Sequence, residues 1–265
     1  DLKRCQLNCA NKNNLINDPL RILRFFRFYA EYNFNFECSL IIFITENKKL
    51  LREVASERII YELRKIFKGK SSLKSLLLLN EIKLFDWLQK YEDLSSYYMR
   101  NLNIAHFKSK ELERFLPLYY LVETLEEVAI KKLKFSRFEI SSSKVMNKWK
   151  KKLINKSINK FTEIERFEMH SEMENILPAF IFYLPFKYQN YWLTRWRDKE
   201  DKLFHPGNLI NGNILKTHCN LNNGPILGNL LKYLSKEYAF ERINNFDEAI
   251  YEAKRWIQQN APKCD

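Results

Sequence analysis

Residues 17–28 read NDPLRILRFFRF, and this stretch decides the fold class of the chain. The carboxylate of Asp18 can accept hydrogen bonds from the free N–H groups of a first helical turn, and Pro19 suits the first helical position. The pattern therefore predicts a helix that begins at Pro19. Its polar face has three arginines at every third position: Arg21, Arg24 and Arg27. Guanidiniums on an otherwise apolar helix need negative partners, which are either protein carboxylates or a nucleotide.

The composition favours a helical protein with a polyanionic partner. Of 265 residues, 46% are hydrophobic, enough for one large domain or a few small ones. Only five glycines and seven prolines interrupt the chain, which indicates mostly helical structure. The formal charge of +13 favours nucleic acid first and an anionic membrane second. An AT-rich coding sequence, which inflates Lys, Asn and Ile, could supply part of that charge.

The cysteines and the apolar runs indicate the cellular compartment of the protein. The five cysteines are scattered: Cys5, Cys9, Cys38, Cys219 and Cys264. Cys5 and Cys9 lack a second pair, so we expect no zinc site, and the odd number favours a reduced, intracellular compartment. The longest apolar runs, 76–79 and 176–184, are too short to span a bilayer, and no signal peptide is visible. We therefore expect no membrane partner.

A second helix with capping signals follows the first. Residues 56–68 place Ile59, Ile60 and Leu63 on one face, and we expect Ser56 to cap the start and Gly69 to end it. Between the two helices, residues 33–37 are expected to form a loop. Residues 39–45 suit either a short strand or a helix.

These two segments resemble the neck of class II tRNA nucleotidyltransferases and bacterial poly(A) polymerases. The family motif is an acidic pair, two further residues and an arginine at the head of a helix that ends in Arg-Phe. Asp18 and Arg21 match the two residues that read the incoming base. The position before Asp18, which is commonly acidic in the family, is Asn17 here. The second family motif matches Ser-Glu-Arg-Ile at 56–59. The resemblance implies a helical fold, residues 39–45 included, and gives Glu57 and Arg58 a role in supporting the base-reading helix. For that second motif the alternative is an ordinary capped helix.

The chemistry of an Asp–Arg pair suits base selection. A carboxylate accepts a hydrogen bond from an exocyclic amine, and a guanidinium donates to a ring nitrogen or a carbonyl oxygen. C and A present such an amine, whereas U and G present a carbonyl oxygen that a carboxylate repels. We therefore predict nucleotide binding by Asp18, Arg21 and Arg24, supported by Asn17 and Arg27. Without the family, an N-cap carboxylate paired with Arg21 for helix stability is favoured.

Residues 131–160 are strongly basic, with Glu139 as their only acid. Lysine is suited to following phosphates without reading sequence. We predict RNA contact by five lysines: Lys144, Lys148, Lys150, Lys151 and Lys152.

A second phosphate site is predicted where Gly224-Pro225 begins a helix with free N–H groups. Gly228 allows close approach of another backbone. Residues 224–228 match the family's Gly-Pro-x-x-Gly segment, although packing between helices explains Gly228 equally well.

The remaining segments read as helices of a body domain. Residues 71–98 stay helical in pattern, and 111–130 form an amphipathic segment interrupted at Pro117. The acidic residues around His170 have the spacing of a charged helix surface, so neither a metal site nor an acid–base pair is expected there.

The predicted fold is all-α: a multi-helix neck, body and tail in an elongated array. Residues 1–13 are a remnant of the head–neck junction, 14–70 the neck, 71–206 the body with the basic segment, and 207–265 the tail. The implied function is the RNA-binding and nucleotide-selecting part of a CCA-adding or poly(A)-adding enzyme. Its partners are tRNA on the acceptor-stem side, CTP and ATP.

The catalytic part is expected elsewhere, because the chain has neither a Gly-rich turn nor an Asp-x-Asp pair. The family's chemistry needs those carboxylates for two metal ions, so we expect Mg²⁺ in a separate head domain and no cofactor on this chain. The expected location is the cytoplasm or the interior of an organelle with an AT-rich genome. One alternative is a non-catalytic RNA-binding module derived from the same family, and another is a helical scaffold protein whose charge comes from coding bias.

Overall fold

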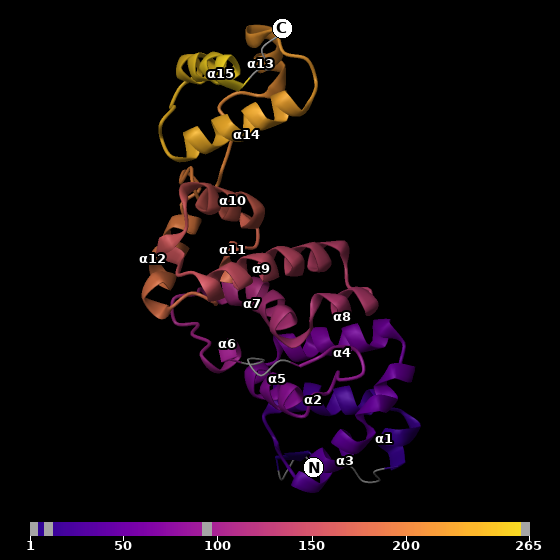
Figure 1. Ribbon diagram of the computed structural model, residues 1–265. Helices are drawn as coiled ribbons and strands as arrows, with labels where there is room; N and C mark the ends of the chain where they lie inside the picture. The colour runs from indigo at the N-terminus through magenta and orange to yellow at the C-terminus, as the bar shows by residue number, and fades with distance from the viewer. Residues whose placement is uncertain (1–4, 8–12, 92–96, 261–265) are drawn as a thin grey trace. The chain divides into compact units, whose positions relative to one another are not determined.

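The computed structural model describes residues 5–7, 13–91 and 97–260 (Figure 1). The predictions on Cys9, Cys264 and residues 1–4 lie outside these residues. The chain divides into two compact units. The first contains residues 1–150 and 178–189, and the second contains 151–177 and 190–265. The predicted all-α class is confirmed, since helices make up almost all regular structure of the described residues.

The first unit is built from short helices. In chain order they are α1 Asn13–Asn17, α2 Leu20–Tyr32, α3 Cys38–Asn47, the 3₁₀ helix η2 Lys48–Glu53, α4 Ser56–Lys68, α5 Ser72–Glu81, α6 Tyr97–Arg100, α7 Ser109–Thr124, α8 Glu127–Lys132 and α9 Arg137–Asn155. The last residues of α9 belong to the second unit. Helices α11 Leu177–Ile181 and α12 Phe186–Arg197 also contain residues of both units.

The second unit is helical as well. Its other helices are η3 Ile158–Lys160, α10 Glu163–Met173, α13 Gly212–Cys219, α14 Pro225–Ala239 and α15 Phe246–Asn260. Helices α13, α14 and α15 pack around a core in which Leu215, Leu230 and Ala253 are fully buried. Among the described residues, no helix is both long and apolar enough to cross a membrane.

Two predicted helix starts are wrong in detail. Helix α2 begins at Leu20 with Pro19 at its N-cap, and no side-chain cap is present there. The main-chain carbonyl of Asp18, and not its carboxylate, accepts the N–H of Arg21 at 3.0 Å. The reason is that α1 ends at Asn17, directly before, so the carboxylate of Asp18 is left to face arginines. Helix α4 likewise has Ala55 at its N-cap, and Ser56 is its first residue.

Other segment predictions divide. Residues 38–47 are helical, which settles the strand-or-helix alternative. The predicted loop at 33–37 contains a strand, β2 Asn35–Phe36, which pairs in parallel with β1 Gln6–Leu7. The helical prediction for 71–98 is wrong for residues 82–91, because Lys83 takes a left-handed φ of 51° and ends the helix, whereas Tyr97 and Tyr98 are helical in α6. Helix α7 continues through Pro117.

Helix α2 is the centre of the first unit's core, packed against α4 and α5 (Figure 1). Ile22, Leu23 and Phe26 on α2 are completely buried. The turn between α4 and α5 presses on the end of α2: the N–H of Ser71 donates to the carbonyl of Ala30 at 2.7 Å. Gly69 ends α4 as predicted, and its contact with α2 explains why a glycine is there.

Replacing Gly69 with alanine is expected to lower the free energy of unfolding by about 2 kcal/mol, because the new methyl group overpacks the turn. A Cβ at this position would lie 2.7 Å from the main chain of Ala30. Urea unfolding of the variant measures the change. Gly228→Ala is the matched control, since a Cβ there meets nothing within 4 Å and alanine favours the helix. Equal stability of the two variants would contradict the predicted clash.

Candidate functional site

The predicted base-reading pair lies at the start of α2, open to solvent. The Oδ2 atom of Asp18 is 3.6 Å from Nε of Arg21, and the two side chains are 30% and 49% exposed. The Oδ1 atom of Asp18 is 3.6 Å from Nη2 of Arg58 on α4. These ion pairs are longer than hydrogen bonds, so the three polar groups keep donor and acceptor capacity for a ligand.

A buried carboxylate lies deeper between the same helices. Glu62 on α4 is 2% exposed and accepts two hydrogen bonds from Nη1 of Arg27, at 2.9 and 3.2 Å. Nε of Arg24 lies 3.6 Å from its Oε1 atom. Arg27 is therefore paired with a protein carboxylate, which is the first of the two alternatives for the arginines of this helix. Arg24 remains partly exposed beside Arg21.

Sequence reasoning did not identify Glu62, although a signal was present. Glu62 is three residues after Ile59 and four before Ile66, both fully buried, so it lies on the buried face of α4. A carboxylate on such a face needs a basic partner, and the arginines of α2 are the nearest candidates in the sequence.

The site carries two uncompensated positive charges. Four guanidiniums, from Arg21, Arg24, Arg27 and Arg58, face the carboxylates of Asp18 and Glu62. Asn17 and Glu57, predicted as supporting residues, are exposed on α1 and α4. The arrangement can accept an amine at Asp18, donate to ring nitrogens from Arg21, and attract phosphate through the excess charge.

The basic segment divides into lysines paired with buried or half-buried acids and lysines exposed to solvent. Nζ of Lys150 is paired with Glu123, which is 2% exposed and also accepts a hydrogen bond from the hydroxyl of Tyr183 at 2.9 Å. Glu165 pairs with Lys152 at 3.5 Å and with Lys156 at 2.7 Å. The hydrogen bond from Lys156 lowers the pKa of Glu165 to about 2. Three predicted lysines are exposed along α9: Lys144, Lys148 and Lys151.

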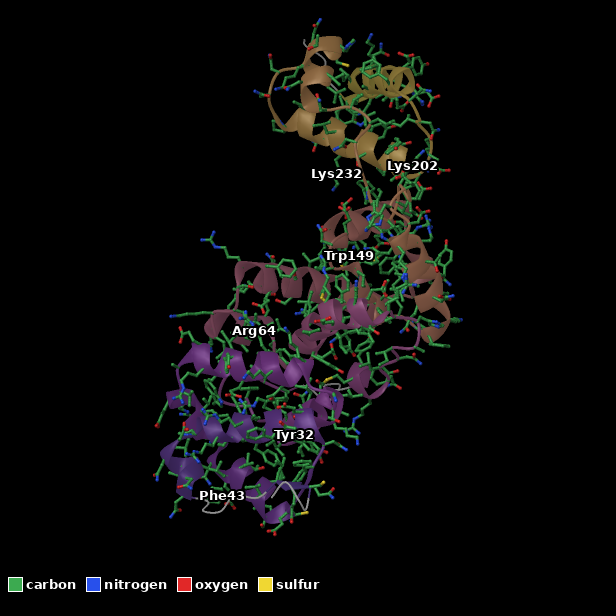
Figure 2. All side chains as sticks on the ribbon, turned by 180° about the vertical axis from the view of Figure 1, so that it is seen from behind. Tyr32, Phe43, Arg64, Trp149, Lys202 and Lys232 are labelled. Carbon is green, nitrogen blue, oxygen red and sulfur yellow. The ribbon has the colours of Figure 1, made fainter. Side chains whose placement is uncertain are left out.

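These three lysines share one face of α9. Their spacing of four and three residues places them one above the other along the helix. The opposite face holds Met146 and Trp149, both fully buried, with Trp149 labelled in Figure 2. The exposed positive charge of these three lysines is thus directed to solvent from one face of α9.

The predicted phosphate position at the start of α14 is also open. Gly224 precedes Pro225, the first residue of the helix, and both are exposed. A Cβ added to Gly224 or to Gly228 would meet no atom within 4 Å, so close helix packing does not explain Gly228. The start of α14 is therefore exposed, which is compatible with an anion at its N-terminus.

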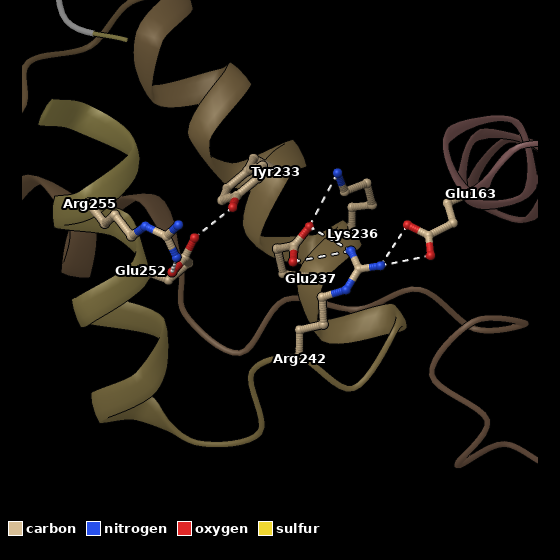
Figure 3. A network of polar contacts seen from close by, with 7 residues as sticks. All are labelled: Glu163, Tyr233, Lys236, Glu237, Arg242, Glu252 and Arg255. Carbon is tan, nitrogen blue, oxygen red and sulfur yellow. Dashed lines mark hydrogen bonds and ion pairs between the residues drawn. The ribbon is translucent and has the colours of Figure 1, made fainter. Parts of the chain in front are cut away.

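A polar network holds α14 against α10 (Figure 3). The guanidinium of Arg242 donates to both oxygens of Glu163, at 2.6 and 2.7 Å, and to Glu237 at 3.2 Å. Lys236 lies 3.2 Å from Glu237 in the same network. The hydrogen bond from Arg242 lowers the pKa of Glu163 below its usual range. Glu163 and Glu237 are both bound by Arg242, so their carboxylates are not available to hold a ligand.

His170 is a packed side chain. Its ring lies 4.1 Å from the ring centroid of Phe204 and 5.1 Å from that of Trp192, and burial lowers its pKa to about 3. Within the described ranges, no group of three or more His, Cys, Asp or Glu side chains could hold a metal ion.

Residues 33–93 match a family model described as the probable RNA and SrmB-binding site of polymerase A. The chain is 26% identical to a CC-adding tRNA nucleotidyltransferase of Synechocystis sp., over 94% of its length and 67% of that protein's. It is also 26% identical to a CCA-adding enzyme of Ligilactobacillus salivarius, over 91% and 60% of the two chains. The chain thus spans about two thirds of these relatives.

Solved structures show the same fold. The Bacillus stearothermophilus CCA-adding enzyme in complex with CTP matches with a TM-score of 0.68 and 17% identity, over 98% of this chain and 68% of that one. The Thermotoga maritima CCA-adding enzyme complexed with tRNA matches with a TM-score of 0.66 and 18% identity, over 97% and 65%. At this identity the likeness concerns the arrangement of helices.

Proposed function

We propose that the chain is a member of the class II tRNA nucleotidyltransferase and bacterial poly(A) polymerase family, and that it selects the nucleotide and binds tRNA for addition of CCA, or part of it, to tRNA 3′ ends. The observation that carries this proposal is the solvent-open Asp18–Arg21 pair at the start of α2. The pair is braced by α4, through Arg58 beside Asp18 and Glu62 beside the neighbouring Arg24, and both of its groups can bond to the pairing edge of a base.

The pair acts as a template made of protein. Asp18 accepts a hydrogen bond from the exocyclic amine of cytosine or adenine, and Arg21 donates to the adjacent ring nitrogen. Uracil or guanine presents a carbonyl oxygen to the Asp18 carboxylate, and two acceptors repel each other. Arg24 and Arg58 supply positive charge for the triphosphate, because the site has more guanidiniums than carboxylates.

The phosphoryl-transfer step is assigned to a head domain, in the same polypeptide or another. Mg²⁺ held by carboxylates of that domain would stabilise the attacking and leaving oxygens. The described residues do not fit that metal role, since they offer no cluster of possible ligands. This chain contributes binding, orientation and base selection.

The tRNA is proposed to contact two surfaces. The lysine face of α9 follows phosphates of the acceptor-stem side, and the open N-terminus of α14, at Gly224 and Gly228, receives a further phosphate. In this assignment residues 14–70 form the neck, 71–206 the body and 207–265 the tail, and 1–13 join the neck to the head.

Replacing Lys144, Lys148 and Lys151 together with glutamine tests the tRNA surface. We expect about a tenfold loss of tRNA affinity near physiological salt and a salt slope reduced by about two to three, because each lysine releases a counterion from one phosphate. Gel-shift titrations with a tRNA transcript at several salt concentrations measure both quantities.

The matched control removes three exposed lysines outside α9: Lys110, Lys187 and Lys199. It loses the same net charge, so long-range attraction falls equally in both triple variants. An identical affinity and salt slope for the two variants would contradict tRNA contact by α9. Absence of any salt-dependent tRNA binding by the unmodified chain would contradict the proposed function itself.

A further inference from the structure

A pocket of about 330 Å³ lies between α4, α7 and the start of α9, separate from the Asp18–Arg21 site. Its apolar walls include Phe67, Pro117, Leu118 and Phe138. Phe67 and Leu118 belong to the buried core, so the floor is rigid. Such a combination of apolar walls and a few polar groups is typical of a site for an organic ligand.

The rim of the pocket is cationic. Arg64, Lys68 and Arg114 line it together with a single acid, Glu139. Arg64 donates to both oxygens of Glu139, at 3.3 and 2.8 Å, and Figure 2 shows Arg64 on α4. Among the described residues, no carboxylate pairs with Lys68 or Arg114, and both side chains are exposed. The rim thus has two positive charges left for an anion.

Phe138 supplies an aromatic surface at the same place. It is 59% exposed on the first turn of α9, and a phenyl ring so open to water gains little from the fold. Its backbone is fixed by the capping interaction before it, since the carboxylate of Glu139 accepts the N–H of Ser136 at 2.9 Å. An exposed ring on a fixed backbone, beside the cations of Lys68 and Arg114, fits a nucleotide, with the base on the ring and the phosphates on the cations.

We propose that this pocket binds one unstacked nucleotide of a single RNA strand, with its base against Phe138 and its phosphates at Lys68 and Arg114. The inference rests on the proposed function, because the nucleotide belongs to the RNA that α9 is proposed to bind. An RNA strand is favoured over a free nucleotide because α9 continues from Phe138 to the exposed Lys148 within the first unit. That distance is about 15 Å at the helical rise, so one strand can contact both.

The test uses the full chain and a fluorescent single-stranded oligonucleotide of about a dozen uridines, one of them 5-iodouridine for photocrosslinking. Fluorescence anisotropy gives the affinity. We expect Phe138→Ser and Arg114→Gln each to weaken binding by about tenfold, the first through lost stacking and the second through a lost phosphate contact. Ile154→Ser, which removes an equally exposed apolar side chain from α9, and Lys65→Gln on α4 should leave the affinity unchanged.

The crosslink gives a second readout that does not depend on a variant. After irradiation and tryptic digestion, the labelled peptide should be residues 138–144, which follow Arg137 and end at Lys144. The pocket is overturned as an RNA site if the crosslink lies elsewhere or if Phe138→Ser binds like the unmodified chain. If AMP suppresses the crosslink to that peptide as effectively as unlabelled oligonucleotide does, the occupant is a free nucleotide. If only polyglutamate suppresses the crosslink, the occupant is an acidic peptide.

The two proposals fail in distinguishable ways. If the unmodified chain binds the tRNA transcript with the expected salt dependence while the pocket variants and their controls bind the oligonucleotide equally, only the pocket is wrong. If the unmodified chain binds neither RNA, the tRNA function is wrong and the pocket fails with it.

Discussion

Replacing Glu62 with alanine is expected to lower the free energy of unfolding by about 3 kcal/mol. Glu62 is 2% exposed and binds the guanidinium of Arg27 through both of its oxygens. Without it, Arg27 keeps a charge that is only 17% exposed and has lost its carboxylate partner. The neighbouring Arg24 loses its ion pair as well, although it can turn further toward solvent.

Urea unfolding followed by circular dichroism measures this effect. Glu57→Ala is the matched control, because Glu57 is an exposed carboxylate on the same helix and should change the free energy of unfolding by less than about 0.5 kcal/mol. Equal stability of the Glu62 and Glu57 variants would show that the buried carboxylate does not hold α2 and α4 together.

The location of the candidate site follows from local sequence signals, but the contacts of α4 that hold its residues in place do not. Pro19 and the arginine repeat predict a polar stripe on a helix, and the structure places Asp18 and Arg21 at its solvent-open start. The cap assigned to Asp18 is wrong because α1 ends one residue before it, and nothing in residues 13–17 announces so short a helix. Arg58 was named from the family motif; its contact with Asp18 depends on how α4 packs.

Contacts between distant segments explain most other differences. Lys48 is 9% exposed, and its Nζ atom donates to the carbonyls of Ile82 and Lys83, at 2.8 and 3.1 Å, and pairs with Asp86 at 2.9 Å. No periodicity within residues 48–53 indicates a partner so far along the chain. The basic segment shows the same limit: charge alone does not distinguish Lys150, which is paired with a buried Glu123, from the exposed Lys151.

Replacing Arg21 with alanine is expected to reduce the preference for CTP over UTP by about 10- to 100-fold, in the protein that joins this chain to its phosphoryl-transfer domain. In the proposed base reading the guanidinium donates to the ring nitrogen of cytosine, and a good pair of base contacts contributes about 1–3 kcal/mol of discrimination. The fold should tolerate the change, because Arg21 is half exposed and its ion pair with Asp18 is long. Arg52→Ala, an exposed arginine on η2, is the control of equal charge.

The ratio of CTP to UTP incorporation by the Arg21→Ala variant, measured with a tRNA transcript as primer, tests most directly whether a protein side-chain pair reads the base. The account predicts a ratio that falls at least about tenfold while the ratio of the Arg52→Ala control stays unchanged. A folded, active Arg21→Ala protein that keeps the full preference for CTP would contradict it.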